Sequence, residues 1–156
     1  MKKKIYIFIL TVVTLVNLNA QRQKSIDLNW QTDFEKAQQL ASTENKLILI
    51  YFTGFDRSDS CKMLNEDLFY TEKFHKIAVE HLILVRVNTP RRKDAISENQ
   101  KNKNKELSDR YHQKVHPTVV LTDAKGKQLG IIESYNYLRD TSQHYTLIYK
   151  TIKMRP

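Results

Sequence analysis

The chain has 156 residues, of which 40% are hydrophobic, 10% aromatic and 28% charged, and its net charge is +9. This length fits one domain with a single core, and only three glycines and three prolines exclude collagen-like, linker-like and disordered chains. A single cysteine excludes an internal disulfide and any zinc site built from several cysteines.

The first twenty residues have the pattern of a secretory signal peptide. Three lysines, Lys2–Lys4, precede the apolar stretch Ile5–Val16, and Ala20 offers a small residue for cleavage. The alternative is a retained membrane anchor, but this stretch is shorter than the roughly 20 residues that span hydrocarbon. The sequence therefore predicts a signal peptide over 1–20 and one exported domain over 21–156, with no membrane span after cleavage.

A basic stretch lies between Arg91 and Lys105. It carries six lysines and arginines against two acids, Asp94 and Glu98, and it is almost free of apolar residues. Removal of the signal peptide takes away three lysines and no acid, so the net charge falls from +9 to +6. Because no aromatic residues interleave with the basic ones, we interpret the stretch as a solvated loop rather than a surface for nucleic acid or anionic membrane.

The first half of the domain alternates helix and strand. Thr32 and Glu35 form a capping box, which predicts a helix from about 31 to 44. The unbroken apolar run Leu47–Phe52 is typical of a central strand covered on both faces.

A second helix is predicted to follow this strand, with Ser58 as its N-cap. Its apolar stripe contains Cys61, Leu64 and Leu68. The next strand is predicted at 81–88, and two strands joined through a helix form a right-handed parallel unit.

The second half predicts a helix over roughly 100–112 and then two antiparallel strands, 118–122 and 128–132. Gly126 in the connection suits a tight turn. A closing amphipathic helix is predicted from the i, i+3, i+4, i+7 spacing of Tyr145, Ile148, Tyr149 and Ile152. The predicted order is α-β-α-β-α-β-β-α.

This order resembles the thioredoxin-like superfamily, and in particular the exported bacterial thioredoxin-like proteins. The family pattern has a Trp before the first helix, Asn-Lys before the strand, Phe-Thr-Gly-x-Asp-Trp-Cys-x-x-Cys after it and Pro-Thr before the hairpin. The matching positions here are Trp30, Asn45-Lys46, Phe52–Cys61 and Pro117-Thr118. The resemblance spans about residues 30 to 135. It implies an α/β thioredoxin-like fold, with a central mixed sheet of four or five strands flanked by helices, in a periplasmic or secreted bacterial protein.

The departures from the family pattern fall on its chemistry. The resemblance implies that Ser58 stands in the place of the nucleophilic cysteine and Cys61 in that of the resolving cysteine. Arg57 replaces the Trp before the pair, and Tyr51 replaces an acidic residue that helps to move a proton. Because disulfide exchange needs a thiolate, a serine hydroxyl cannot take over the attack. Dithiol reductase activity is therefore not expected.

Two interpretations of Cys61 stay open. The first is a small buried hydrophobic residue, as most free cysteines are. In the second, the helix N-terminus and His116, which precedes the candidate cis-proline Pro117, stabilise a reactive thiolate. His112 and His116 are four residues apart, but Pro117 takes His116 out of helical geometry, so no metal site and no cofactor is predicted.

Two functions follow from these alternatives. In the first, the protein binds an extended peptide without turnover, in a groove formed by Asp59, Ser60, Pro117 and Thr118 near Ser58. Its expected partners are extended peptides or unfolded, thiol-containing envelope proteins, and no nucleic acid. The alternative is a residual single-thiol redox enzyme that uses Cys61 with His116.

Overall fold

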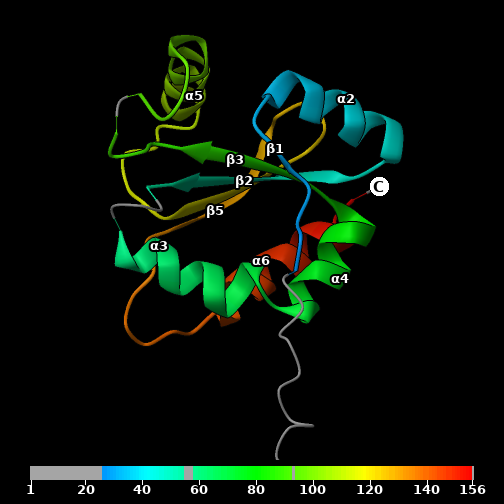
Figure 1. The fold of residues 1–156 in the computed structure, drawn as a ribbon. Coiled ribbons are helices and arrows are strands. Elements are labelled where there is room, and N and C mark those ends of the chain that lie inside the picture. Colours follow the sequence, from blue (N-terminus) through cyan, green and yellow to red (C-terminus); the bar gives the residue numbers. More distant parts are fainter. Residues whose placement is uncertain (1–25, 55–57, 93, 156) are drawn as a thin grey trace, which may run out of the picture.

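The computed structural model describes residues 26–54, 58–92 and 94–155, which form a five-stranded mixed sheet between two layers of helices (Figure 1). The strand order is β1-β3-β2-β4-β5, in which β1, β3 and β2 are parallel, β4 is antiparallel to β2, and β5 is antiparallel to β4. This confirms the predicted fold class. The strands are β1 (Trp30–Gln31), β2 (Leu47–Thr53), β3 (Leu82–Asn88), β4 (Thr118–Thr122) and β5 (Gln128–Glu133).

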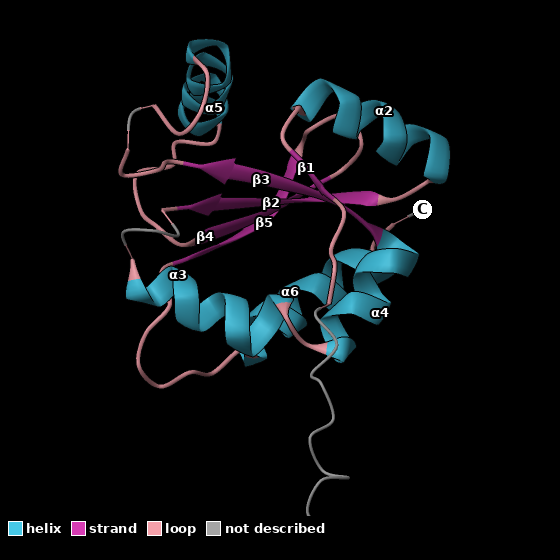
Figure 2. Cartoon of the chain, viewed as in Figure 1, coloured by secondary structure: helices cyan, strands magenta, loops and turns pink. Residues whose placement is uncertain are grey.

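The helices divide between the two faces of the sheet (Figure 2). One face is covered by α2 (Phe34–Glu44) and α5 (Glu98–Arg110), which we call the α5 layer. The other face is covered by four segments that we call the α3 layer: α3 (Asp59–Leu64), the π-helix η2 (Asn65–Phe69), α4 (Glu72–His81) and α6 (Ser142–Lys153). In this described part of the chain, no helix is both long enough and apolar enough to cross a membrane.

Strand β2 is central and buried along its whole length, as its apolar run predicts. It pairs with β3 on one side and with β4 on the other, so that Tyr51 lies between Arg86 and Val119. The carboxyl end of β2 therefore lies between two neighbouring strands, and the chain leads from this end to α3. Residues 55–57, including Arg57, lie outside the described residues, as does the predicted signal peptide.

The start of the first helix differs from the prediction. The N-cap of α2 is Asp33, whose Oδ1 accepts a hydrogen bond from the Lys36 N–H at 3.1 Å, so the capping box at Thr32 and Glu35 is wrong. The positive end of the helix dipole also stabilises the negative charge of this carboxylate. Asn45 ends the helix in the left-handed conformation, with φ of 51°. This explains why Asn-Lys stands immediately before β2.

Three elements are absent from the predicted order. Strand β1 has two residues and is held by its pairing with Leu84 and Val85 of β3. The π-helix η2 continues directly from α3, and α4 follows it, capped by the Thr71 hydroxyl on the Phe74 N–H at 3.2 Å. His81 is the last residue of α4, so the predicted strand begins one residue later, at Leu82.

The second half follows the prediction more closely. Helix α5 lies two residues before its predicted bounds, and it takes up the end of the basic stretch, which is therefore not a loop throughout. Strands β4 and β5 form the predicted hairpin, with Gly126 at φ of 84°. In α6, Ile148 is buried as predicted, but Tyr149 is 43% exposed. Instead Leu147 packs inward, where it lies against Gly130 so closely that a Cβ there would meet its Cδ1 at 2.3 Å.

The α3 layer contains a cluster of aromatic rings. The Tyr51 and Phe69 ring centroids are 4.6 Å apart, and Phe69 also meets Phe74 at 5.0 Å and Trp30 at 5.2 Å, both edge to face. The Arg86 guanidinium lies over the Trp30 ring, 4.6 Å from its centroid. Edge-to-face and cation–π contacts of this kind add specific geometry to the apolar burial.

Candidate functional site

Ser58 begins α3, at the place where the sequence predicts the N-cap. Its backbone is extended, and its Oγ accepts a hydrogen bond from the Cys61 N–H at 3.3 Å. The cap satisfies one of the donors that every helix leaves open at its first turn. The Ser58 hydroxyl thus stabilises the start of α3, a structural role that requires no reactivity of this group.

Cys61 lies in the first turn of α3 and is 0% exposed. A thiol without contact to solvent cannot meet a disulfide of another molecule unless α3 moves. The burial agrees with the first interpretation of Cys61, that of a small apolar residue.

Tyr51 lies beneath α3. Its hydroxyl donates a hydrogen bond to the backbone carbonyl of Cys61 at 3.3 Å, and both groups are buried. Burial raises the pKa of Tyr51 far above its ordinary value, and the side chain of Thr53 opposes this effect in part. Tyr51 therefore stays protonated and holds the first turn of α3 in place. The acidic residue that the family pattern has at this position could accept a proton, whereas the Tyr51 hydroxyl does not.

Pro117 and Thr118 lie at the same end of the sheet as Ser58. Thr118 pairs with Phe52 near the end of β2, and the His116–Pro117 peptide bond is cis. Both residues are buried: the Pro117 carbonyl accepts a hydrogen bond from the Ser134 N–H at 2.8 Å, and the Thr118 hydroxyl donates to the Val115 carbonyl at 2.9 Å. His116 is half-buried.

The remaining predicted binding residues belong to the first turn of α3. Asp59 points outward, with a side chain that is 75% exposed, and pairs with Lys62 at 3.1 Å. Ser60 is half-buried. The topology thus brings the start of α3 and the segment before β4 to one end of the sheet, and at this end Ser58, Asp59, Ser60 and His116 have some exposed surface.

This arrangement is matched by known proteins. A family model described as a thioredoxin-like domain matches residues 34–144. The chain belongs to the thioredoxin-like family. It is 32% identical over 115 residues to the disulfide bond reductase DsbH of Chlamydia pneumoniae, an alignment that covers 72% of this chain and 68% of the relative.

Solved structures show the same fold. A DsbH oxidoreductase superposes with a TM-score of 0.71 at 24% identity, covering 88% of this chain and 92% of that one. A thioredoxin from Thermus thermophilus superposes with a TM-score of 0.61 at 16% identity, covering 81% and 88%. The resemblance to thioredoxin-like proteins is thereby confirmed for this family member, which has one cysteine in all.

Sequence reasoning missed a cavity next to His116. It has a volume of about 460 Å³ and unites the basic stretch with the segment before Pro117. The residues that line it come from the end of β3, the loop after it, α5 and the turn after α5: Asn88, Thr89, Pro90, Arg91, Arg92, Ile96, Lys101, Asn104, Lys105, Ser108, Gln113, Lys114 and His116. The basic stretch is visible in the sequence, but the topology of the fold decides that it lines one cavity together with Lys114 and His116.

Metal ligands do not gather in the described part of the chain, where no group of three or more His, Cys, Asp or Glu side chains could hold an ion. His112 lies after the end of α5 with φ of 54°, so it does not share a helical face with His116. His144 is buried in α6 against the Tyr135 ring, 5.8 Å between centroids. These histidines are therefore separate features of the fold.

Proposed function

We propose that this family member is an exported binding protein that holds extended or unfolded segments of thiol-containing envelope proteins without dithiol exchange. The observation that carries the proposal is the state of Ser58 and Cys61, the two residues at the positions of the family's cysteine pair. The position that the family uses for attack holds a helix-capping hydroxyl, and the remaining thiol is 0% exposed. Export rests on the signal-like pattern of residues 1–20.

The binding site is the end of the sheet where α3 begins. Ser58 and Ser60 lie there with some exposed surface, and His116 precedes the cis peptide bond on the neighbouring segment. Thioredoxin folds accept extended peptides at this end through backbone pairing, a mode that needs no reactive cysteine. The loss of the nucleophile therefore removes turnover and leaves this mode of binding.

The relationship to a disulfide bond reductase favours a second candidate, a single-thiol enzyme. The Cys61 thiolate would attack a disulfide, form a mixed disulfide and release one thiolate. Because the chain has no second cysteine, two thiols from other molecules would be needed. The first would attack the Cys61 sulfur of the mixed disulfide and release the fully reduced substrate, and the second would attack the first thiol's sulfur, releasing Cys61 and leaving the two thiols joined as a disulfide. This route requires α3 to open far enough to expose Cys61.

A binding measurement separates the two candidates. The probe is a fluorescent, permanently unfolded polypeptide, prepared once with its thiols alkylated and once with a mixed disulfide. We expect the protein and its Cys61→Ala variant to bind the alkylated probe with equal affinity. The single-thiol enzyme is supported instead if a covalent complex forms with the disulfide probe and is lost in Cys61→Ala.

Insulin reduction gives the second test. We expect no turnover by the protein, and turnover by Ser58→Cys, since this change supplies a second thiol three residues before Cys61. Rates for the unmodified protein near those of an ordinary thioredoxin would contradict the proposal. Failure of the unmodified protein and of Cys61→Ala to bind the alkylated probe would contradict the proposal as well.

A further inference from the structure

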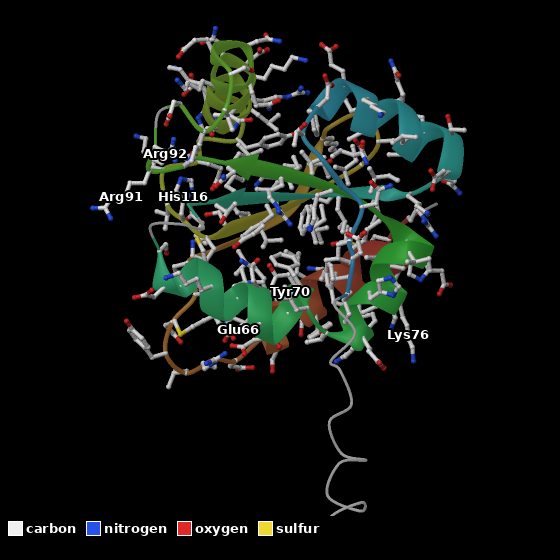
Figure 3. All side chains as sticks on the ribbon, in the orientation of Figure 1. Glu66, Tyr70, Lys76, Arg91, Arg92 and His116 are labelled. Carbon is white, nitrogen blue, oxygen red and sulfur yellow. The ribbon has the colours of Figure 1, made fainter. Side chains whose placement is uncertain are left out.

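The basic cavity beside His116 is the strongest unexplained feature of the described surface. Five of its lining side chains carry a positive charge: Arg91, Arg92, Lys101, Lys105 and Lys114. No carboxylate belongs to the lining among the described residues. Figure 3 shows Arg91 and Arg92 next to His116 at one end of the molecule. The cavity therefore concentrates positive charge directly beside the proposed binding site.

The carboxylates that pair with Arg92, Lys101 and Lys105 are not among the lining residues, and they hold these three cations weakly. Arg92 pairs with Asp94 at 2.7 Å, and the two side chains are 78% and 71% exposed. Lys101 pairs with Glu98 and Lys105 with Asp109, each at 2.5 Å, and both acids are at least 65% exposed. Exposed ion pairs of this kind contribute little, so a ligand carboxylate can replace them.

The shape of the cavity favours a polypeptide over a single ion or a membrane. Its volume of about 460 Å³ lies in the range that holds a drug-sized ligand, well beyond one inorganic anion. Pro90 and Ile96 give it an apolar wall, and Asn104 and Gln113 add amide groups. A membrane presents a flat, extended surface, which a concave site of this size does not fit.

From charge, shape and position we infer that the cavity binds an acidic segment, rich in Asp and Glu, of the polypeptide held at the neighbouring site. This inference rests on the proposed function, because His116 lies in the cavity and directly precedes Pro117. An extended chain that passes Ser58 and His116 continues into the cavity, where its carboxylates meet Lys101, Lys105 and Lys114. The protein would thus prefer partners in which acidic residues flank the bound segment.

The test uses two fluorescent, thiol-free peptides that differ only in their final residues, a run of aspartates or a run of asparagines. At low salt we expect the aspartate peptide to bind about tenfold more tightly, about 1.4 kcal/mol. At about 0.5 M NaCl this advantage should shrink severalfold, because ions screen exposed charges. The triple variant Lys101→Gln, Lys105→Gln, Lys114→Gln should lose the advantage and keep its affinity for the asparagine peptide.

The matched control removes three exposed lysines elsewhere, Lys76→Gln, Lys125→Gln and Lys127→Gln, and has the same net charge as the cavity variant. Lys76 lies at the opposite end of the molecule in Figure 3. This control should keep the advantage. If both triple variants lose it equally, the effect comes from net charge alone, and the inference is overturned.

The remaining outcomes separate the inference from the proposed function. Equal affinity for both peptides overturns the acidic site and leaves the binding function standing. Binding of the aspartate peptide alone, abolished by the cavity variant, supports the acidic site and contradicts a general peptide site. Binding of neither peptide contradicts both, and cavity-dependent binding to vesicles of equal parts phosphatidylglycerol and phosphatidylcholine in its place would assign the cavity to membranes.

Discussion

The α3 layer and helix α5 differ in how many apolar residues they bury against the sheet. The α3 layer packs the rings of Trp30, Tyr51, Phe69 and Phe74 together, and Cys61 lies on the same side without exposure. In the α5 layer, by contrast, α5 contributes one buried residue, Leu107, and otherwise presents charged and amide side chains. The surroundings of Cys61 are thus an apolar core, whereas the exposed side chains of α5 carry charges.

The accessibility of Cys61 is the most direct way to break this comparison. If the α3 layer stays closed, iodoacetamide reaches the thiol only when the protein unfolds. For a domain of ordinary stability, alkylation should then be at least about a thousandfold slower than in denaturant. The measurement is mass spectrometry of labelled protein over time. Rapid labelling of the folded protein would mean that α3 opens locally and that the single-thiol enzyme is within reach.

Truncation of Phe69 should destabilise the fold strongly. Phe69 is 0% exposed and contacts three other aromatic rings, so Phe69→Ala is expected to lower the free energy of unfolding by about 3–5 kcal/mol. Urea denaturation measures this change. Leu107→Ala, the corresponding change in α5, should cost less, about 2 kcal/mol, because Leu107 is 8% exposed at the edge of its cluster. An equal loss in both variants would mean that the layers do not differ in packing.

His144 should make the α3 layer sensitive to acid. Burial lowers the pKa of His144 to about 4, an effect that the nearby Asp140 charge opposes in part. In the unfolded chain its pKa is about 6.5. Between these values the unfolded state binds the additional proton, so stability is complete above about pH 6.5 and falls as the pH drops towards 4, by about 3 kcal/mol.

Urea denaturation at pH 7 and pH 4.5 tests this prediction. His144→Leu should lose the part of the pH dependence between 6.5 and 4, whereas His112→Asn, a change at an exposed histidine in the left-handed conformation, should keep it. The prediction fails if both variants follow the pH profile of the parent. In that case the ring of His144 would be reached by water or a partner in solution.

Removal of a single exposed charge from α5 should have the smallest effect on stability. Lys105→Gln removes an ion pair with Asp109 in which both side chains are more than 60% exposed. The free energy of unfolding is expected to change by less than about 0.5 kcal/mol. A thermal denaturation curve checks it. A loss of several kcal/mol would show that the α5 layer depends on its charges as the α3 layer depends on its rings.

Local sequence signals predicted the elements that local chemistry determines. The apolar run of β2, the cap at Ser58 and the turn at Gly126 each lie where the sequence indicates. In each case the residues themselves favour the observed backbone. The family resemblance added that Ser58 and Pro117 lie at the same end of the sheet.

The missed features depend on contacts that the sequence does not display. Strand β1 has two residues and exists because β3 offers it hydrogen bonds. Helix α4 has apolar residues at Phe74, Ile77 and Ala78, which is too few to distinguish a second helix from a continuation of α3. In α6, Leu147 lies close to Gly130 of β5 and Tyr149 stays exposed, an arrangement that the helical spacing alone does not display.

The candidate site shows the same division. The sequence identifies Ser58, Cys61 and His116 and leaves two interpretations of the thiol open, because burial is a property of the packed fold. The role of Tyr51 as a donor to the Cys61 carbonyl also becomes visible only when α3 lies on β2. The basic stretch was recognised, but its position beside His116 follows from the topology.

Trp30 gives this protein a built-in optical probe. It is the only tryptophan in the chain, and its ring lies between the Arg86 guanidinium and the rings of Tyr51 and Phe69. Its emission therefore comes from a single, defined environment at the edge of the α3 layer. Opening of that layer should appear as a shift in wavelength or intensity without any attached dye. The question whether Cys61 ever becomes accessible can thus be followed in real time in the unmodified protein.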